Sequence, residues 1–265
     1  MQSEHTLPWE QVHRDAVVTD LHAHPSLKVS LFNRVFTERV RSGRSYDPFG
    51  MRTDLERLQQ GGVNLLLSTL YAPERGILED CRILRVLKYL MPRRWKRVFG
   101  RPYDRVFLEM MDTMERQVEA ARDGETGKRP AQVVTSVTEL DQVLAGEPGG
   151  PIGIIHNVEG SHVLEGKLEN LQVLFDRGVA YLTLAHFYEN EVVHPCFPYP
   201  ESVQRFGCFM GDRNLALGLK PFGEQVVEMM IELGMIIDVV HCTPPARKRI
   251  YDIAGNRLPI IASHV

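Results

Sequence analysis

Residues 219–265, LKPFGEQVVEMMIELGMIIDVVHCTPPARKRIYDIAGNRLPIIASHV, contain the same helix-then-strand pattern twice. In the first copy, apolar residues recur at helical spacing before Gly234 and the apolar run MIIDVVH: Phe222, Val226, Met230 and Leu233. In the second copy, Thr243 precedes two prolines and a helical segment that stops near Gly255, and the run LPIIASH follows. Strands separated by helices predict parallel pairing with right-handed crossovers.

The same alternation extends toward the N-terminus and predicts an α/β fold. The strands that we expect begin at Ala16, Val63, Ile152, Val179, Met235 and Leu258. Several of these runs are apolar on both faces, as in strands buried inside a barrel or under helices. We therefore predict a single α/β domain over residues 1–265, a (β/α)₈ barrel with a mostly helical insertion at about residues 72–130.

The composition limits the classes of partner and compartment. The 265 residues are 43% hydrophobic and 25% charged with a net charge of -3, which gives no global reason to expect nucleic acid or an anionic membrane as partner. The start MQSEHTLPWEQVHRDA lacks a basic segment followed by an apolar one, so we expect a cytoplasmic chain. The four cysteines lack metal-finger spacing, and we expect reduced thiols, although Cys196 and Cys208 share a loop and could pair.

Histidines collect where the predicted strands end. Of ten histidines, five lie at or just beyond a strand end, namely His22, His24, His186, His241 and His264. In a (β/α)₈ barrel the carboxyl ends of the strands converge on one mouth, so residues far apart in the sequence meet there. Imidazole nitrogens in such a cluster are suited to zinc, and the pattern predicts a metal site.

The first strand carries the sharpest single motif, TDLHAHPS. His22 and His24 are two residues apart, so in a strand both rings project to the same face and can bind one ion. Asp20 shares that face, and it either orients a ligand or accepts a backbone hydrogen bond at the strand end.

The segment IGIIHNVEGSH supplies a carboxylate. Alternation places His156 and Glu159 on opposite faces, and we choose Glu159 as the ligand because a carboxylate can bridge two metals. His162, beyond the strand, is expected to support a ligand or to fix the loop. In YLTLAHF, His186 is either a ligand or a donor that polarises a substrate carbonyl.

Five motifs together resemble the membrane (renal) dipeptidases, zinc peptidases of the amidohydrolase superfamily: DLHAH, NVEGSH, RGVAYLTLAH, LKPFGEQVVEMMIELGMIIDVVH and PIIASH. The resemblance implies a barrel with two zinc ions, a dipeptide substrate, and attack by a hydroxide that bridges the metals. It implies that His22, His24 and Glu159 hold one ion, and that Glu159, His241 and His264 hold the other. It also implies that His186 is a catalytic, substrate-binding residue.

Two departures from the family pattern leave alternatives open. The family has His-x-Asp on its first strand where this chain has His22 and His24, which keeps another superfamily reaction open, such as lactone or N-acyl amide hydrolysis. Only six strands are predicted where a barrel needs eight, and the arginine and late aspartate that the family carries are not found. We therefore expect a chain truncated after the sixth strand, and a catalytically incomplete metal-binding fragment is a further alternative. Membrane contact is not expected, and a homodimer is left open.

Overall fold

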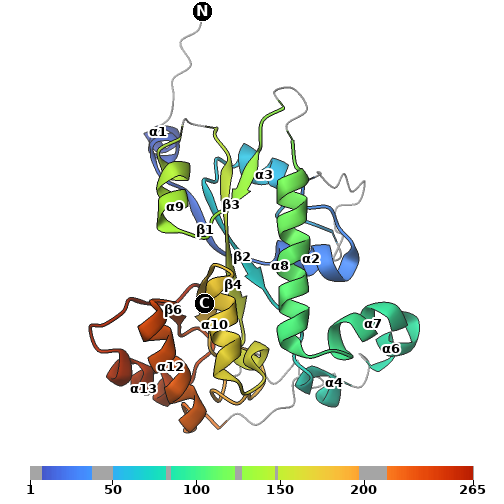
Figure 1. Ribbon diagram of the computed structural model, residues 1–265, viewed down its shortest axis with the longest axis vertical. Coiled ribbons are helices and arrows are strands. Elements are labelled where there is room, and N and C mark those ends of the chain that lie inside the picture. The colour runs from blue at the N-terminus through green and yellow to red at the C-terminus, as the bar shows by residue number, and fades with distance from the viewer. Residues whose placement is uncertain are drawn as a thin grey trace, which may run out of the picture. The chain divides into compact units, whose positions relative to one another are not determined.

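The structure is a computed structural model that describes residues 8–37, 50–81, 85–122, 127–146, 149–196 and 214–264 (Figure 1). The chain divides into two compact units, which are described separately below. The first, unit 1, comprises Met1–Ser68 and Thr113–Ile155, and the second, unit 2, comprises Thr69–Asp112 and His156–Val265. The prediction of a single domain stays a prediction.

Unit 1 is built on parallel strands. Strand β1 (Thr19–Ala23) pairs with β2 (Leu65–Leu70), and β3 (Ala131–Val133) pairs with the first half of β4 (Ile152–Glu159). Strands β2 and β4 are neighbours and continue into unit 2. The helices of unit 1 are α1 (Pro8–Asp15), α2 (Pro25–Phe32), α3 (Leu55–Gln60), α9 (Val137–Leu144) and the C-terminal part of α8 (Tyr103–Ala120).

Apolar side chains from these strands and helices form the core of unit 1. Leu66 and Ile154 contribute from the strands, and Met114 and Val118 contribute from one face of α8. Local hydrogen bonds define the helix starts: the Asp54 carboxylate accepts from Arg57 N at the start of α3, and Ser136 and Glu139 form a reciprocal cap on α9.

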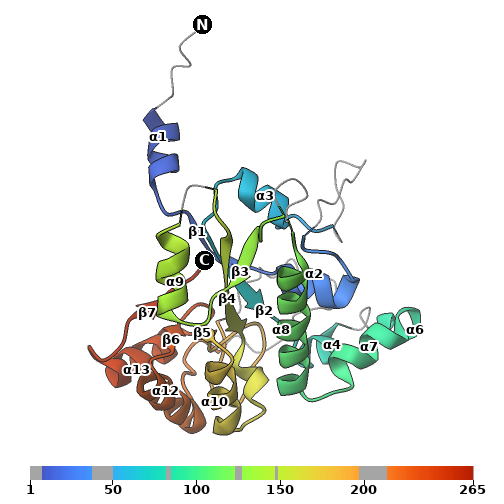
Figure 2. The same ribbon diagram turned by 45° about the horizontal axis from the view of Figure 1, so that its top comes forward.

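Unit 2 holds the second half of β4 and three further parallel strands, in the order β4-β5-β6-β7. The strands are β5 (Val179–Thr183), β6 (Ile236–Asp238) and β7 (Ile260–Ile261), and the helices that follow β4, β5 and β6 are α10 (Leu168–Asp176), α12 (Pro221–Leu233) and α13 (Pro244–Ala254). Helix α12 contacts both α10 and α13, and the three lie side by side in both views (Figures 1 and 2). A short 3₁₀ helix, η1 (Ser161–Leu164), follows β4.

The predicted helix ends in this region are confirmed. Gly234 ends α12 in the left-handed conformation with φ +75°, and the Thr243 hydroxyl caps α13 by accepting from Ala246 N. Fully buried side chains fill the space between helices and strands, including Tyr181, Leu182 and Met230.

Among the described residues, region 72–130 is mostly helical, as expected. It contains α4 (Gly76–Asp80), α6 (Leu87–Leu90), α7 (Pro92–Phe99) and α8. Within the described parts of the chain, every helix is too short or too polar to cross a bilayer.

The strand prediction needs two corrections. The sequence does not predict strand β3, so among the described residues the strand before His264 is the seventh and not the sixth. Its three residues, Ala131–Val133, mix apolar and polar side chains and give no periodic signal. The strands before His241 and His264 are also shorter than predicted, ending at Asp238 and Ile261.

Candidate metal centre

The carboxyl ends of the four strands in unit 2 align in one row. Parallel register pairs Glu159 with Thr183, Thr183 with Asp238, and Asp238 with Ile261. Because the four residues are hydrogen-bonded neighbours across the sheet, chain positions at equal distances beyond them emerge at the same edge.

A histidine stands three residues beyond each member of this row. These residues are His162, His186, His241 and His264, which follow β4, β5, β6 and β7. The fold of unit 2 thus brings together residues that are 105 positions apart, Glu159 and His264. The predicted convergence of strand-end histidines is observed within this unit.

Glu159, His241 and His264 form a cluster of candidate metal ligands. One ligand atom from each lies within 4.8 Å of the others. Glu159 Oε1 is 3.3 Å from His241 Nε2 and 3.5 Å from His264 Nε2, and the two imidazole nitrogens are 3.0 Å apart. The Glu159 side chain is 3% exposed, whereas those of His241 and His264 are 13% and 29% exposed. A buried carboxylate faced by two partly exposed imidazoles is a donor set suited to a divalent transition metal.

Backbone geometry and a buried aspartate shape the two loops that carry these histidines. His241 has φ +63°, a left-handed conformation that non-glycine residues adopt at a cost, and such strain concentrates at functional sites. Asp238 is fully buried and accepts from the hydroxyls of Thr183 and Ser263 at 2.6 and 2.7 Å, and from Ser263 N at 3.2 Å. Asp238 thus ties β5, β6 and the loop after β7 together.

Ser263 extends this network to the metal cluster. Its Oγ lies 2.9 Å from His264 Nδ1 and donates to Asp238 Oδ2. Because the Ser263 hydroxyl donates its proton to Asp238, its oxygen accepts a hydrogen bond from His264 Nδ1–H. The lone pair of His264 Nε2 is then directed toward Glu159.

His186 occupies the neighbouring position over β5. Its ring is almost fully buried, with Nε2 3.6 Å from Glu159 Oε2 and Nδ1 3.0 Å from Glu74 Oε1. The His186 and His241 rings meet edge to face with centroids 5.0 Å apart. His186 therefore lies at the edge of the cluster with one nitrogen toward it.

Glu74 is a residue that the sequence analysis missed. It follows β2 in the turn-like segment YAPERG, and its carboxylate is 6% exposed. Burial alone would raise the pKa of Glu74, but the hydrogen bond and the positive charge of His186 outweigh burial and lower this pKa to about 2. A carboxylate shortly after a buried strand was the available signal.

His162 fixes a loop and lies apart from the metal cluster. Its Nε2 is 2.9 Å from the carbonyl oxygen of Ala72, and its ring packs edge to face against Tyr103 and Phe107. Burial lowers the pKa of His162, which favours the neutral ring. This geometry matches the loop-fixing alternative.

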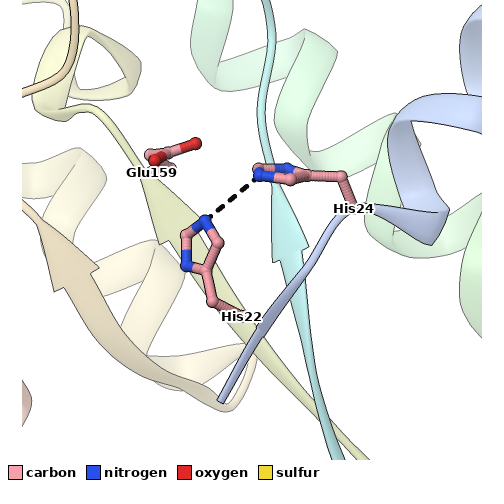
Figure 3. Close-up of side chains that lie close together, drawn as sticks. All are labelled: His22, His24 and Glu159. Carbon is pink, nitrogen blue, oxygen red and sulfur yellow. Dashed lines mark hydrogen bonds between the residues drawn. The ribbon is translucent and has the colours of Figure 1, made fainter. Parts of the chain in front are cut away.

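The His-x-His pair lies on β1 and just beyond it, in unit 1. The Nε2 atoms of His22 and His24 are 3.1 Å apart, as the dashed line in Figure 3 marks; the figure also draws Glu159, at the end of β4. Asp20 Oδ1 accepts from the backbone N–H of His22 at 3.0 Å. Of the two expectations for Asp20, the structure thus displays the backbone hydrogen bond.

Comparison with known proteins adds the family. The family model described as membrane dipeptidase, peptidase family M19, matches residues 8–265. The chain belongs to this family. The resemblance inferred from the sequence motifs is confirmed.

Curated members of the membrane dipeptidase family align over part of their length. Dipeptidase 3 of Rattus norvegicus is 31% identical over 160 residues, which is 60% of this chain and 28% of the relative. Dipeptidase verJ of Clonostachys rogersoniana is 26% identical over 214 residues, 80% of this chain and 45% of the relative. The chain thus spans less than half the length of these relatives.

Solved structures share the fold. A metallo peptidase from Rhodobacter sphaeroides, liganded with a phosphinate mimic of the dipeptide L-Ala-D-Ala, superposes with a TM-score of 0.63 at 17% identity, covering 94% of this chain and 64% of that one. The probable dipeptidase PvdM from Pseudomonas aeruginosa gives 0.58 at 19% identity, covering 96% and 54%. The α/β fold with parallel strands is therefore shared with these two structures.

The expectation of a cytoplasmic chain is wrong. The matching family is that of the membrane dipeptidases. This finding overturns the compartment that we inferred from the N-terminal sequence. The expectation of reduced cysteines also fails, because Cys81 is disulfide-bonded, as is typical of oxidising compartments. Cys196 is a free thiol, so it does not pair with Cys208, which lies outside the described residues.

Proposed function

We propose that this chain is a metal-dependent dipeptidase that hydrolyses the peptide bond of dipeptides. The observation that carries the proposal is the buried Glu159 carboxylate faced by the Nε2 atoms of His241 and His264, with His186 beside it. Family membership and the phosphinate-bound relative from Rhodobacter sphaeroides support a dipeptide as substrate. The whole fold, in this proposal, is a (β/α)₈ barrel.

The metal centre in this proposal holds two zinc ions. Glu159 offers two carboxylate oxygens and would serve both ions, His241 and His264 would hold one of them, and His22 with His24 would hold the other. The donor chemistry supports zinc, since carboxylate oxygen and neutral imidazole are its ordinary ligands. When bound, zinc supplies a Lewis acid for the scissile carbonyl and a water molecule of lowered pKa.

The residues of the chain orient the reactants. Ser263 presents the Nε2 lone pair of His264, and Glu159 balances the charge of the ions from a buried position. His186 directs Nε2 toward the cluster and supplies a substrate-binding group beside the scissile carbonyl. Asp20 holds the backbone at His22, and His162 holds the segment after β4 against Ala72.

A direct test combines metal analysis with a substrate panel. The purified chain is loaded with zinc and assayed on dipeptides, including ones with a D-residue at the C-terminal position, beside N-acyl amides and lactones. Hydrolysis of dipeptides alone supports the proposal, and hydrolysis of lactones or acyl amides alone contradicts it. Zinc bound without any hydrolysis would instead indicate a metal-binding protein without peptidase activity. His194→Ala is a matched histidine control, because the His194 ring pairs with Glu189 at 3.6 Å and is not a member of the cluster.

A further inference from the structure

The carboxylate of Glu74 is the centre of a buried hydrogen-bond network in unit 2. Its two oxygens lie 3.0 and 3.1 Å from His186 Nδ1. Oε1 also accepts from the backbone N–H groups of Phe187 and Tyr188 at 3.0 and 3.4 Å, and Oε2 accepts from the Tyr71 hydroxyl at 2.8 Å. Glu74 is 5% exposed and His186 is 4% exposed.

This network constrains one specific property of His186, the nitrogen that carries its proton. An ionised carboxylate only accepts hydrogen bonds, so the His186 nitrogen that faces Glu74 must be the protonated one. The low pKa of Glu74 keeps its carboxyl ionised at neutral pH. Burial and the charge of Glu74 raise the pKa of Tyr71 well above its ordinary value, so Tyr71 stays a neutral donor.

The network also fixes the direction of the ring. Oε1 binds both the imidazole and the backbone N–H of the next residue, Phe187, so the ring is held relative to the backbone that follows it. The Phe187 ring stacks on the imidazole with centroids 3.7 Å apart. With Nδ1 bound on one side, Nε2 is the nitrogen that faces Glu159, at 3.6 Å.

We propose that Glu74 is a positioning residue that holds His186 with its proton on Nδ1 and its Nε2 directed at the Glu159–His241–His264 cluster. The kinetic consequence rests on the proposed dipeptidase function, whereas the position of the proton does not. Glu74 contacts neither substrate nor metal in this role and acts only through His186. Outer partners of this kind change affinity or activity about 10- to 100-fold when they are removed.

The first experiment reads the proton directly. Long-range ¹H–¹⁵N correlation NMR of the ¹⁵N-labelled full chain without added metal identifies which nitrogen of the neutral His186 ring is protonated, with His186→Gln used to assign its signals. We expect the proton on Nδ1. A proton on Nε2 in the wild-type chain overturns the proposal, and this outcome needs no stable variant and no enzyme activity.

The second experiment removes the acceptor. In Glu74→Ala we expect the Nδ1–H signal to be lost from the neutral ring, whereas in Glu74→Gln the amide oxygen still accepts and the Nδ1–H signal remains. Tyr71→Phe is the matched control, because it removes one donor to Glu74 and leaves the His186 contact intact, so the signal should not change. A folded Glu74→Ala chain that keeps Nδ1–H contradicts the proposal.

The kinetic experiment uses the zinc-loaded chain. We expect Glu74→Ala to lower kcat on a dipeptide about 10- to 100-fold, with KM and zinc content close to wild type, and Glu74→Gln to restore part of the loss. A loss of zinc parallel to the loss of rate would indicate a merely structural role and would overturn the positioning role. If the wild-type chain hydrolyses no dipeptide, the proposed function fails while the NMR result still decides the role of Glu74.

Discussion

The Nε2 atoms of His241 and His264 lie 3.0 Å apart because each histidine stands three residues beyond a member of the same register pair, Asp238 and Ile261. Because the two strands are parallel, residues at the same distance beyond a register pair lie at the same height above the sheet edge. The adjacent pair Glu159 and Thr183 then supplies the carboxylate and, three residues after Thr183, His186. The site of unit 2 is therefore a consequence of sheet register.

The Ser263 hydroxyl should determine how well His264 binds metal. Ser263→Ala removes the acceptor of the His264 Nδ1 proton and leaves Asp238 without one donor, so we expect zinc affinity to fall about 10- to 100-fold. Ser263→Thr keeps a hydroxyl and should bind nearly as the wild type does. Competition with a chromogenic chelator measures both, and equal affinities for the alanine and threonine variants would refute the role of the hydroxyl.

Glu74 should make stability depend on pH in the acid range. Its folded pKa is lowered from 4.5 to about 2, so its contribution is fully present above pH about 4.5 and is lost as the pH falls toward about 2. A pKa lowered by this amount corresponds to about 3 kcal/mol. Urea unfolding of the wild type and of Glu74→Gln across this range measures it: the difference between the two should shrink as the pH falls. A difference that stays constant contradicts the assigned protonation of Glu74.

Two glycines of α12 should differ in why they resist substitution. An alanine Cβ at Gly223 would lie 2.2 Å from the carbonyl oxygen of Val192 and 2.7 Å from Leu219 Cδ1, so Gly223→Ala should cost about 3 kcal/mol through overpacking. At Gly234 a Cβ meets open space, and only the φ of +75° opposes it, at a cost of about 1 to 2 kcal/mol. Thermal and urea unfolding compare them, and equal costs would contradict the steric explanation for Gly223.

Much of unit 2 could be predicted from the sequence because local signals agreed there. Gly234 and Thr243 mark helix ends by backbone and capping chemistry, and the apolar run between them contains β6. The histidines could be placed at strand ends because parallel strands share one carboxyl edge.

The remaining features depend on contacts that have no local signal. Strand β3 is held by pairing with β4 and has neither alternation nor length to identify it. Glu74 acquires its environment from His186, 112 residues away, so the segment YAPERG resembles an ordinary turn. The strands before His241 and His264 end earlier than their apolar runs because Asp238 captures the following backbone and Ser263.

Zinc content after dialysis, measured by elemental analysis on the wild type and on Glu159→Gln, tests the central claim most directly. A carboxylate shared by both ions predicts about two zinc ions for the wild type and almost none for Glu159→Gln, with His264→Ala retaining about one. His194→Ala should match the wild type. A Glu159→Gln chain that retains as much zinc as the wild type would contradict the proposed metal centre.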